Sequence, residues 1–264
     1  MKQRDADKDF PWWLVFAGAL GVYFAYRVVA DDLYARVLTT LSKGIGITVF
    51  VTLVGFAAAC VIGLGLATAT RSRFLILRQL ARFYIEIIRG VPIIVLLLYV
   101  AFVLAPALVA AFNWAAEGVG LDPIRTRDFS LLWRAILALT IGYSAFIAEV
   151  FRAGLQSVDE GQIEAAEALG LSGWQRFRHI VFPQAFRTIL PPLGNDFVAM
   201  VKDSSLVSVL GVADITQLGK VTSAGNFRYF ETYNVVALIY LAMTVTLSLA
   251  LRRLERRLRA QHRG

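Results

Sequence analysis

Long apolar runs alternate with short polar connections along most of the chain. Six of these runs approach or exceed the ~20 residues that an α-helix needs to cross a hydrocarbon core of ~30 Å. They span Pro11–Ala30, Gly44–Thr70, Val91–Phe112, Leu131–Phe151, Leu193–Val212 and Thr232–Leu251. The second run is overlong and the fifth is the least apolar, so the bounds of the fifth are the least sharply defined. The pattern predicts an all-α integral membrane helical bundle with six spans.

Composition supports a membrane protein over a soluble domain. Of the 264 residues 58% are hydrophobic and only 17% are charged, and the mean hydropathy is +0.63. A typical soluble domain has about 25% charged residues.

Lysine and arginine are distributed unequally between the two sides of the predicted bundle. Eighteen of the 27 fall on one side: in the N-terminal segment, in the connections after the second and fourth spans, and in the C-terminal tail. The positive-inside rule makes this side, with both termini, cytoplasmic. The net charge of +8 therefore reflects topology and does not indicate nucleic-acid binding. The first run could also be a cleaved signal peptide, but the acidic residues before it and the lack of a clear A-x-A site favour a membrane anchor.

The chain lacks the residue patterns of an enzyme. Gly219-Lys220 is the nearest approach to a phosphate-binding loop, but Asp214 and Val221 stand where that loop needs Gly and Ser or Thr. With two histidines and a single cysteine, Cys60, the sequence offers no credible metal site, disulfide or nucleophile arrangement. If the protein moves solutes, we expect another chain to supply the energy.

One cytoplasmic segment, residues 159–183, is too polar to span the membrane and too regular for a linker. An Ala/Glu-rich helix should end at Gly170, and Ser172 and Gln175 have the capping-box spacing that begins a second helix. Trp174, Phe177 and Val181 form an apolar stripe on this second helix, and Pro183 should end it. Two amphipathic helices lying on lipid headgroups would explain the pattern, but Glu164 and Glu167 disfavour contact with an anionic surface.

The same segment carries a family resemblance. It resembles the EAA signature of ABC importer membrane subunits. The matching pattern is Glu164-Ala165-Ala166, three residues, Gly170, nine residues, Ile180, one residue and Phe182-Pro183, with Phe182 where Leu is usual. The stretches "YIEIIRGVPIIVLL" and "FPQAFRTILPPLGNDFVAMVKDSSLVSVLG" resemble the polar amino acid branch, the histidine/glutamine/glutamate-type permeases. The resemblance begins near Thr39. It implies a five-span permease core at residues 39–251 with coupling helices at 159–183, preceded by an extra span within residues 1–38 and followed by a basic tail at 252–264.

The resemblance also implies a mechanism and partners. In this family the two short helices dock into a cleft on a cytoplasmic ATPase subunit, which binds ATP and Mg, so the chain itself needs no cofactor. The resemblance to the family's EAA signature assigns the coupling role to Glu164, Ala165, Ala166 and Gly170. The expected partners are ABC ATPase subunits, an extracytoplasmic substrate-binding protein and a second permease subunit, identical or not. The expected location is the bacterial inner membrane.

Two further polar sets have functional interpretations. Arg71, Arg78, Arg82 and Arg89 share one helical face, which favours anchoring among anionic headgroups over contact with the ATPase. Candidates for the substrate path lie in the fifth span: Asn195, Asp196, Lys202 and Asp203. A zwitterionic amino acid needs a cation and an anion close together, and a Lys202–Asp203 pair that only fixes helix packing is the competing interpretation.

The sequence thus predicts a permease subunit of a binding-protein-dependent ABC importer for polar amino acids. A secondary transporter or channel is the alternative, and a membrane-embedded hydrolase is a distant third. Glu149 is a weaker path candidate that could simply pair with Arg152.

Overall fold

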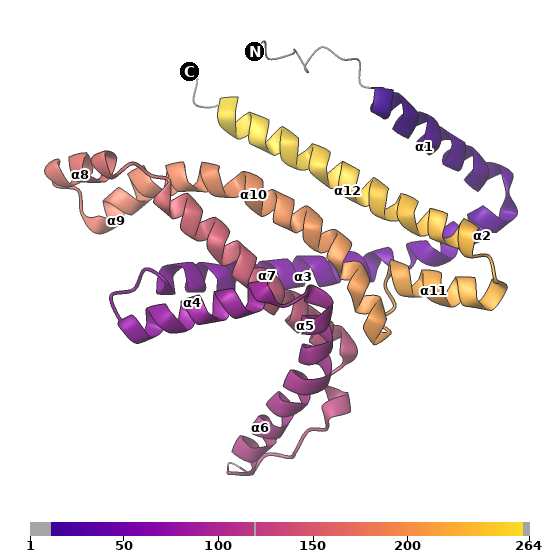
Figure 1. Ribbon diagram of the computed structural model, residues 1–264, viewed down its shortest axis with the longest axis horizontal. Helices are drawn as coiled ribbons and strands as arrows, with labels where there is room; N and C mark the ends of the chain where they lie inside the picture. Colours follow the sequence, from indigo (N-terminus) through magenta and orange to yellow (C-terminus); the bar gives the residue numbers. More distant parts are fainter. Residues whose placement is uncertain (1–11, 119, 261–264) are drawn as a thin grey trace.

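The chain is helical almost throughout. A computed structural model describes residues 12–118 and 120–260, and no β-strand occurs among them (Figure 1). The α-helices are α1 (Trp12–Ala30), α2 (Asp32–Ser42), α3 (Ile45–Ala69), α4 (Leu75–Gly90), α5 (Ile93–Tyr99), α6 (Ala105–Glu117), α7 (Leu131–Gln156), α8 (Glu160–Ala168), α9 (Gly173–Arg176), α10 (Phe182–Asp203), α11 (Ile215–Asn226) and α12 (Tyr229–Ala260). Short turns of other helix types are η1 (π, Val100–Leu104), η2 (3₁₀, Thr126–Asp128), η3 (π, Phe177–Val181) and η4 (3₁₀, Ser204–Leu210).

Four segments of the described chain are long and apolar enough to cross a membrane: residues 32–69, 93–117, 131–156 and 229–256. They correspond to the predicted second, third, fourth and sixth spans, within two residues at the ends of the second and third. The first predicted span corresponds to α1, of which only Gly18–Ala30 stands out as a shorter apolar helix. The fold class is thus confirmed, whereas the count of six spans stays a prediction. Both chain ends, predicted to be cytoplasmic, lie outside the described residues.

The predicted fifth span, Leu193–Val212, does not coincide with one helix. Helix α10 begins earlier, at Phe182, and gives way after Asp203 to the 3₁₀ turn η4, which ends at Gly211 with φ of 79°. The predicted bounds are therefore wrong. The path candidates Lys202 and Asp203 lie at the end of a helix and not near its middle.

The prediction that Pro183 ends the second cytoplasmic helix is also wrong. The π-helical turn η3 continues α9 directly into α10, with the Phe182 amide donating to the Phe177 carbonyl. Pro183 occupies the first turn of α10, where proline's missing N–H is tolerated. The π turn has a different hydrogen-bond pattern from an α-helix, so the chain continues into α10 without a break at the proline.

Small residues bring α3 and α7 together at the centre of the fold. Gly55, Ala59, Gly63 and Ala67 recur every four residues on one face of α3 and are all buried. A Cβ atom added to Gly63 would lie 2.9 Å from Ile147 Cγ2 and 3.1 Å from the Ala148 amide nitrogen of α7. Such small-xxx-small stripes allow close helix packing in membranes.

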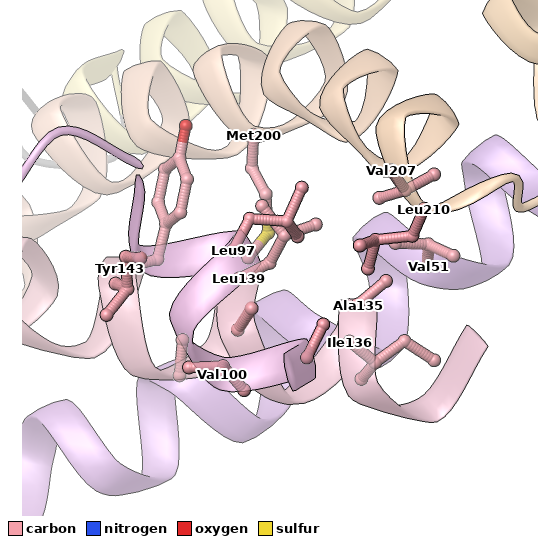
Figure 2. Close-up of a cluster of buried hydrophobic side chains, with 14 of the residues drawn as sticks. Val51, Leu97, Val100, Ala135, Ile136, Leu139, Tyr143, Met200, Val207 and Leu210 are labelled. Atoms are coloured by element: carbon pink, nitrogen blue, oxygen red, sulfur yellow. The ribbon is translucent and has the colours of Figure 1, made fainter. Parts of the chain in front are cut away.

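The main apolar core lies where α5, η1, α7, α10 and η4 meet α3 (Figure 2). Leu97, Val100, Leu139 and Met200 are at most 1% exposed. Tyr143 belongs to the same cluster and, in Figure 2, points its hydroxyl away from the other side chains. From this core the arm formed by α5, η1 and α6 projects away from the other helices (Figure 1).

Two arginines predicted within spans have partners in the structure. Arg134 donates to the carbonyl oxygens of Phe129 (2.8 Å) and Ala101 (3.0 Å), and also to that of Thr126. Arg27 pairs with Asp31 at 3.1 Å. These contacts provide partners for cations that would be costly to bury alone, although Arg27 Nε has no hydrogen-bond partner among the described residues.

Candidate functional site

The predicted coupling segment forms a tight helical corner, which we call the α8–α9 corner (residues 159–176). Gly170 has φ of 76°, the left-handed conformation that glycine adopts without strain. Its amide donates to the Glu167 carbonyl (2.9 Å), and the Leu171 amide donates to the Ala166 carbonyl (3.1 Å). These two hydrogen bonds are a Schellman motif. The predicted role of Gly170 as a helix end is confirmed.

The second helix of the corner begins as predicted. The Ser172 amide donates to Gln175 Oε1 (2.9 Å), and the Gln175 amide donates to Ser172 Oγ (3.4 Å), which completes the capping box. Across the corner, Arg176 of α9 forms an ion pair with Glu167 of α8. Each helix is thus fixed at its end, and the two are held to each other.

The α8–α9 corner is attached to the ends of the two long helices α7 and α10. Gln184 Nε2 donates to Gln162 Oε1 (2.6 Å), and Ser157 Oγ donates to Thr188 Oγ1 (3.1 Å). Beneath these bonds Ile189 is buried against Gly154, where an added Cβ atom would lie only 2.1 Å from Ile189 Cγ1. Close packing thus joins the end of α7 to α10, and the Gln162–Gln184 bond links the corner to α10.

Three of the four predicted coupling residues are exposed: Glu164, Ala165 and Gly170. Ala166 is only 3% exposed and packs inside the corner. No described residue forms an ion pair with Glu164. The exposed residues leave a carboxylate and small side chains available to a partner.

An aromatic edge borders the corner. The rings of Trp174, Phe177 and Phe182 follow one another with centroids 5.9 Å apart, and all three are exposed. The prediction placed Val181 in this stripe, but Val181 packs against the apolar cluster beneath the corner, and Phe182 takes its place. The π turn η3 changes the angle between successive side chains, which the α-helical spacing did not anticipate.

A charged cavity, the first cavity, lies where α4, α7 and α10 converge. Its volume is about 560 Å³. One wall is formed by the break between α4 and α5, where α4 ends at Gly90 and Pro92 precedes α5. Gly142 and Phe146 of α7 and Ala199 of α10 contribute to the others. A space of this size accommodates a small molecule.

Charges of both signs line the first cavity. The Arg89 guanidinium lies 5.7 Å from the centre of the Phe146 ring. On the α10 side, Tyr143 donates its hydroxyl to Asp203 Oδ2 at 2.7 Å, and Asp196 Oδ2 is buried without a hydrogen-bond partner among the described residues. The cavity thus combines one cation with two carboxylates, one of them unsatisfied.

The structure separates the predicted path residues into two sets. Asp196 and Asp203 line the first cavity, whereas Asn195 and Lys202 lie on the neighbouring stripe of α10, exposed and outside it. Within the described chain Lys202 forms no ion pair with Asp203. The competing interpretation of a structural Lys–Asp pair therefore finds no support. Glu149 pairs with Arg152, as expected, with Arg152 Nε 3.0 Å from Glu149 Oε2.

Sequence reasoning missed three charged or aromatic residues of the first cavity: Arg89, Tyr143 and Phe146. Arg89 was assigned to a headgroup-facing stripe with three other arginines. Its position directly before the Gly90–Pro92 break was the available signal, because a broken helix within a membrane protein often lines a cavity. Tyr143 and Phe146 had no such signal within an apolar span.

An all-helical membrane protein with a charged cavity between its helices and a rigid corner of two short helices has the architecture of a transporter's membrane subunit. The chain belongs to the family described as the binding-protein-dependent transport system inner membrane component, which matches residues 60–260. The glutamine transport system permease protein GlnP of Escherichia coli (strain K12) is 39% identical over 219 residues, covering 83% of this chain and 93% of GlnP. The probable amino-acid permease protein YxeN of Bacillus subtilis (strain 168) is 36% identical over 210 residues, covering 80% and 87%.

Solved structures show the same relationship. A chain from the crystal structure of an amino acid ABC transporter with histidines superposes with a TM-score of 0.69 at 34% identity, covering 87% of this chain and 97% of that one. This chain is thus a transport subunit of the ABC type, and the fold and family expected from the EAA-like segment are confirmed.

Proposed function

We propose that this chain forms the translocation path of an amino-acid ABC importer and transmits movement from cytoplasmic ATPase subunits to that path. The relatives' names include glutamine and amino-acid permeases, which supports polar amino acids as the substrate class. An extracytoplasmic binding protein would deliver the substrate, and a second permease subunit would complete the path. ATP and Mg would be bound by the ATPase subunits.

The observation that carries the proposal is that two long helices connect the α8–α9 corner to the first cavity. Helix α10 begins beside the corner and reaches Asp196 fourteen residues later, or ~21 Å at 1.5 Å per residue. In helix α7, the part between Tyr143 at the cavity and Gln156 near the corner has a similar length. Displacement of the corner by a partner would therefore move two walls of the cavity relative to the third wall, formed by α4.

The chemistry of the first cavity suits a zwitterion. Arg89 can hold a substrate carboxylate, and Asp196 and Asp203 can accept from its ammonium group. The neighbouring stripe with Asn195 and Lys202 would contribute to the path where a second permease subunit covers it. In this arrangement the corner, with Glu164, Ala165, Ala166 and Gly170, would lie on the cytoplasmic side of the inner membrane.

The test begins with the subunits of the complex. Affinity purification of the tagged chain from mild detergent should yield ATPase subunits, and the identity of any second permease will show whether the pair is identical. Purification without an ATPase, combined with uptake driven by an ion gradient, would instead establish a secondary transporter.

The path is tested with charge variants of α10. Lys202→Met and the double variant Lys202→Met with Asp203→Asn should both assemble, because neither removes a buried ion pair. Basal ATP hydrolysis should persist in the double variant while uptake is lost. Uptake at the wild-type rate in that variant would remove both residues from the path.

A further inference from the structure

A second charged cavity lies between α4 and α7, on the side nearer to the α8–α9 corner. Its volume is about 350 Å³, and it is bounded by the turn after α3, the middle of α4 and the end of α7. Its charged and amide-bearing lining residues are Arg71, Arg82, Glu86, Glu149, Arg152 and Gln156. None of these residues belongs to the first cavity, and two are members of the arginine stripe that the sequence assigned to headgroups.

The two cavities lie along the same faces of α4 and α7, and we call this shared surface the groove. On α4, Arg82 and Glu86 precede Arg89 of the first cavity by seven and three residues, which puts all three on one face and separates them by ~10 and ~5 Å along the axis. On α7, Glu149 follows Phe146 of the first cavity by one helical turn. Arg89 and Glu149, one from each cavity, are close enough for a favourable electrostatic interaction.

A hydrogen-bonded tyrosine holds the sides of the groove together. Tyr84 of α4 donates its hydroxyl to the Ile141 carbonyl of α7 (3.2 Å) and shares a hydrogen bond of 2.8 Å with Ser144 Oγ. Ile85, 2% exposed, packs next to it. Tyr84 and Ile85 thus connect α4 to α7 beside the two cavities.

Some charges of the second cavity are satisfied and others are free. Glu149 is paired with Arg152, whose Nη1 also donates to Gln156 Oε1 at 2.7 Å. For Arg71, Arg82 and Glu86 the described chain provides no ion pair and no side-chain hydrogen bond. Two guanidinium groups and one carboxylate therefore remain available for a ligand in the second cavity.

We propose that the second cavity binds the amino acid after it leaves the first, as a distinct site on the cytoplasmic half of the path. Arg82, assisted by Arg71, holds the α-carboxylate, because a guanidinium matches a carboxylate with two parallel hydrogen bonds. Glu86 accepts from the α-ammonium group. The inference rests on the proposed import of amino acids.

The phosphate of an anionic lipid is the competing ligand for a basic cavity near a membrane surface. The carboxylates of Glu86 and Glu149 disfavour it, since both would repel a phosphate at close range. A zwitterion, in contrast, uses both signs of charge. The neighbouring first cavity would also be a source of amino acid for this site.

The experiment uses the complete importer, with its ATPase subunits and binding protein, in vesicles of phosphatidylcholine. Uptake of a labelled amino acid and ATP hydrolysis are measured together for the wild type, Glu86→Gln, Arg82→Gln and the control Arg73→Gln, which removes an exposed arginine outside the groove. We expect both groove variants to hydrolyse ATP within about two-fold of the wild type but to import about ten-fold less amino acid per ATP, the loss expected from ~1.4 kcal/mol of binding. The control should match the wild type.

Several results would overturn the inference. An unchanged ratio of uptake to hydrolysis in both groove variants shows that the second cavity does not bind the substrate. If the variants match the wild type in phosphatidylcholine and differ from it only when phosphatidylglycerol is added, the cavity is a lipid site. If a variant fails to assemble, equilibrium binding of the amino acid to the wild-type membrane complex is measured instead. Two amino acids bound per permease chain would support the second site, and one would exclude it. A wild type without ATP-driven uptake contradicts the proposed function itself.

Discussion

Replacing Gly170 by alanine isolates the contribution of one backbone conformation to the α8–α9 corner. Gly170 has φ of 76°, and an added Cβ atom would have no neighbour within 4 Å. The substitution therefore introduces no collision, and its whole cost is that of placing an L-residue in the left-handed region. Gly173, three residues later, is the matched control, because it is helical and an added Cβ would only touch Arg176 Nη2 at 3.8 Å.

The expected cost of Gly170→Ala is ~1–2 kcal/mol. This corresponds to a factor of ~5–30 in the population of the native turn relative to other conformations of the corner. Gly173→Ala carries no such penalty, since alanine is the better helix former. If the ATPase subunits bind only the native corner, their apparent affinity for Gly170→Ala should weaken by up to the same factor.

The assay is titration of purified ATPase subunits onto the membrane subunit in nanodiscs, with ATP-driven uptake measured in parallel. Gly170→Ala should shift the titration to higher ATPase concentration and lower the uptake, whereas Gly173→Ala should resemble the wild type. Equal behaviour of the two alanine variants would refute the reasoning, because it would mean that the left-handed turn does not set the geometry of docking.

Other parts of the structure give further predictions. Gly154→Ala should destabilise the subunit by ~1–3 kcal/mol, because the added methyl group would collide with α10. Gly65→Ala should be neutral or slightly stabilising, because the space around Gly65 is open. Thermal unfolding of both variants in detergent measures the difference. Glu164→Lys should leave the fold unchanged, since Glu164 is exposed, and should lower ATP-driven uptake; wild-type uptake would exclude it as a coupling residue. Cysteines placed at Arg73 and Gly225 should react with a membrane-impermeant reagent from the cytoplasmic and external sides respectively, and the reverse pattern would contradict the topology.

Local chemistry made the α8–α9 corner predictable from the sequence. A glycine at a helix end and a Ser/Gln pair three residues apart act through backbone atoms within one turn, so Gly170 and Ser172 have the conformations expected of them. The prediction for Pro183 was wrong because the π turn η3 joins α9 to α10 and places the proline in the first turn of α10, where it does not end the helix.

The first cavity was only partly predictable because residues far apart in the sequence form it. Asp196 and Asp203 were found, since charges in an apolar run are rare and costly. Arg89 and Tyr143 became functional candidates only when α4 and α7 were placed beside α10. The exclusion of Lys202 from the cavity likewise follows from the rotation of α10, which the seven-residue spacing alone does not define.

Vesicle uptake with a controlled energy source tests import by this chain most directly. The purified complex of permease, ATPase subunits and binding protein is reconstituted with ATP on the side of the α8–α9 corner and with all ion gradients dissipated. We predict accumulation of a polar amino acid that requires ATP hydrolysis and the binding protein. Accumulation that proceeds without ATP and follows an imposed ion gradient would contradict the assignment.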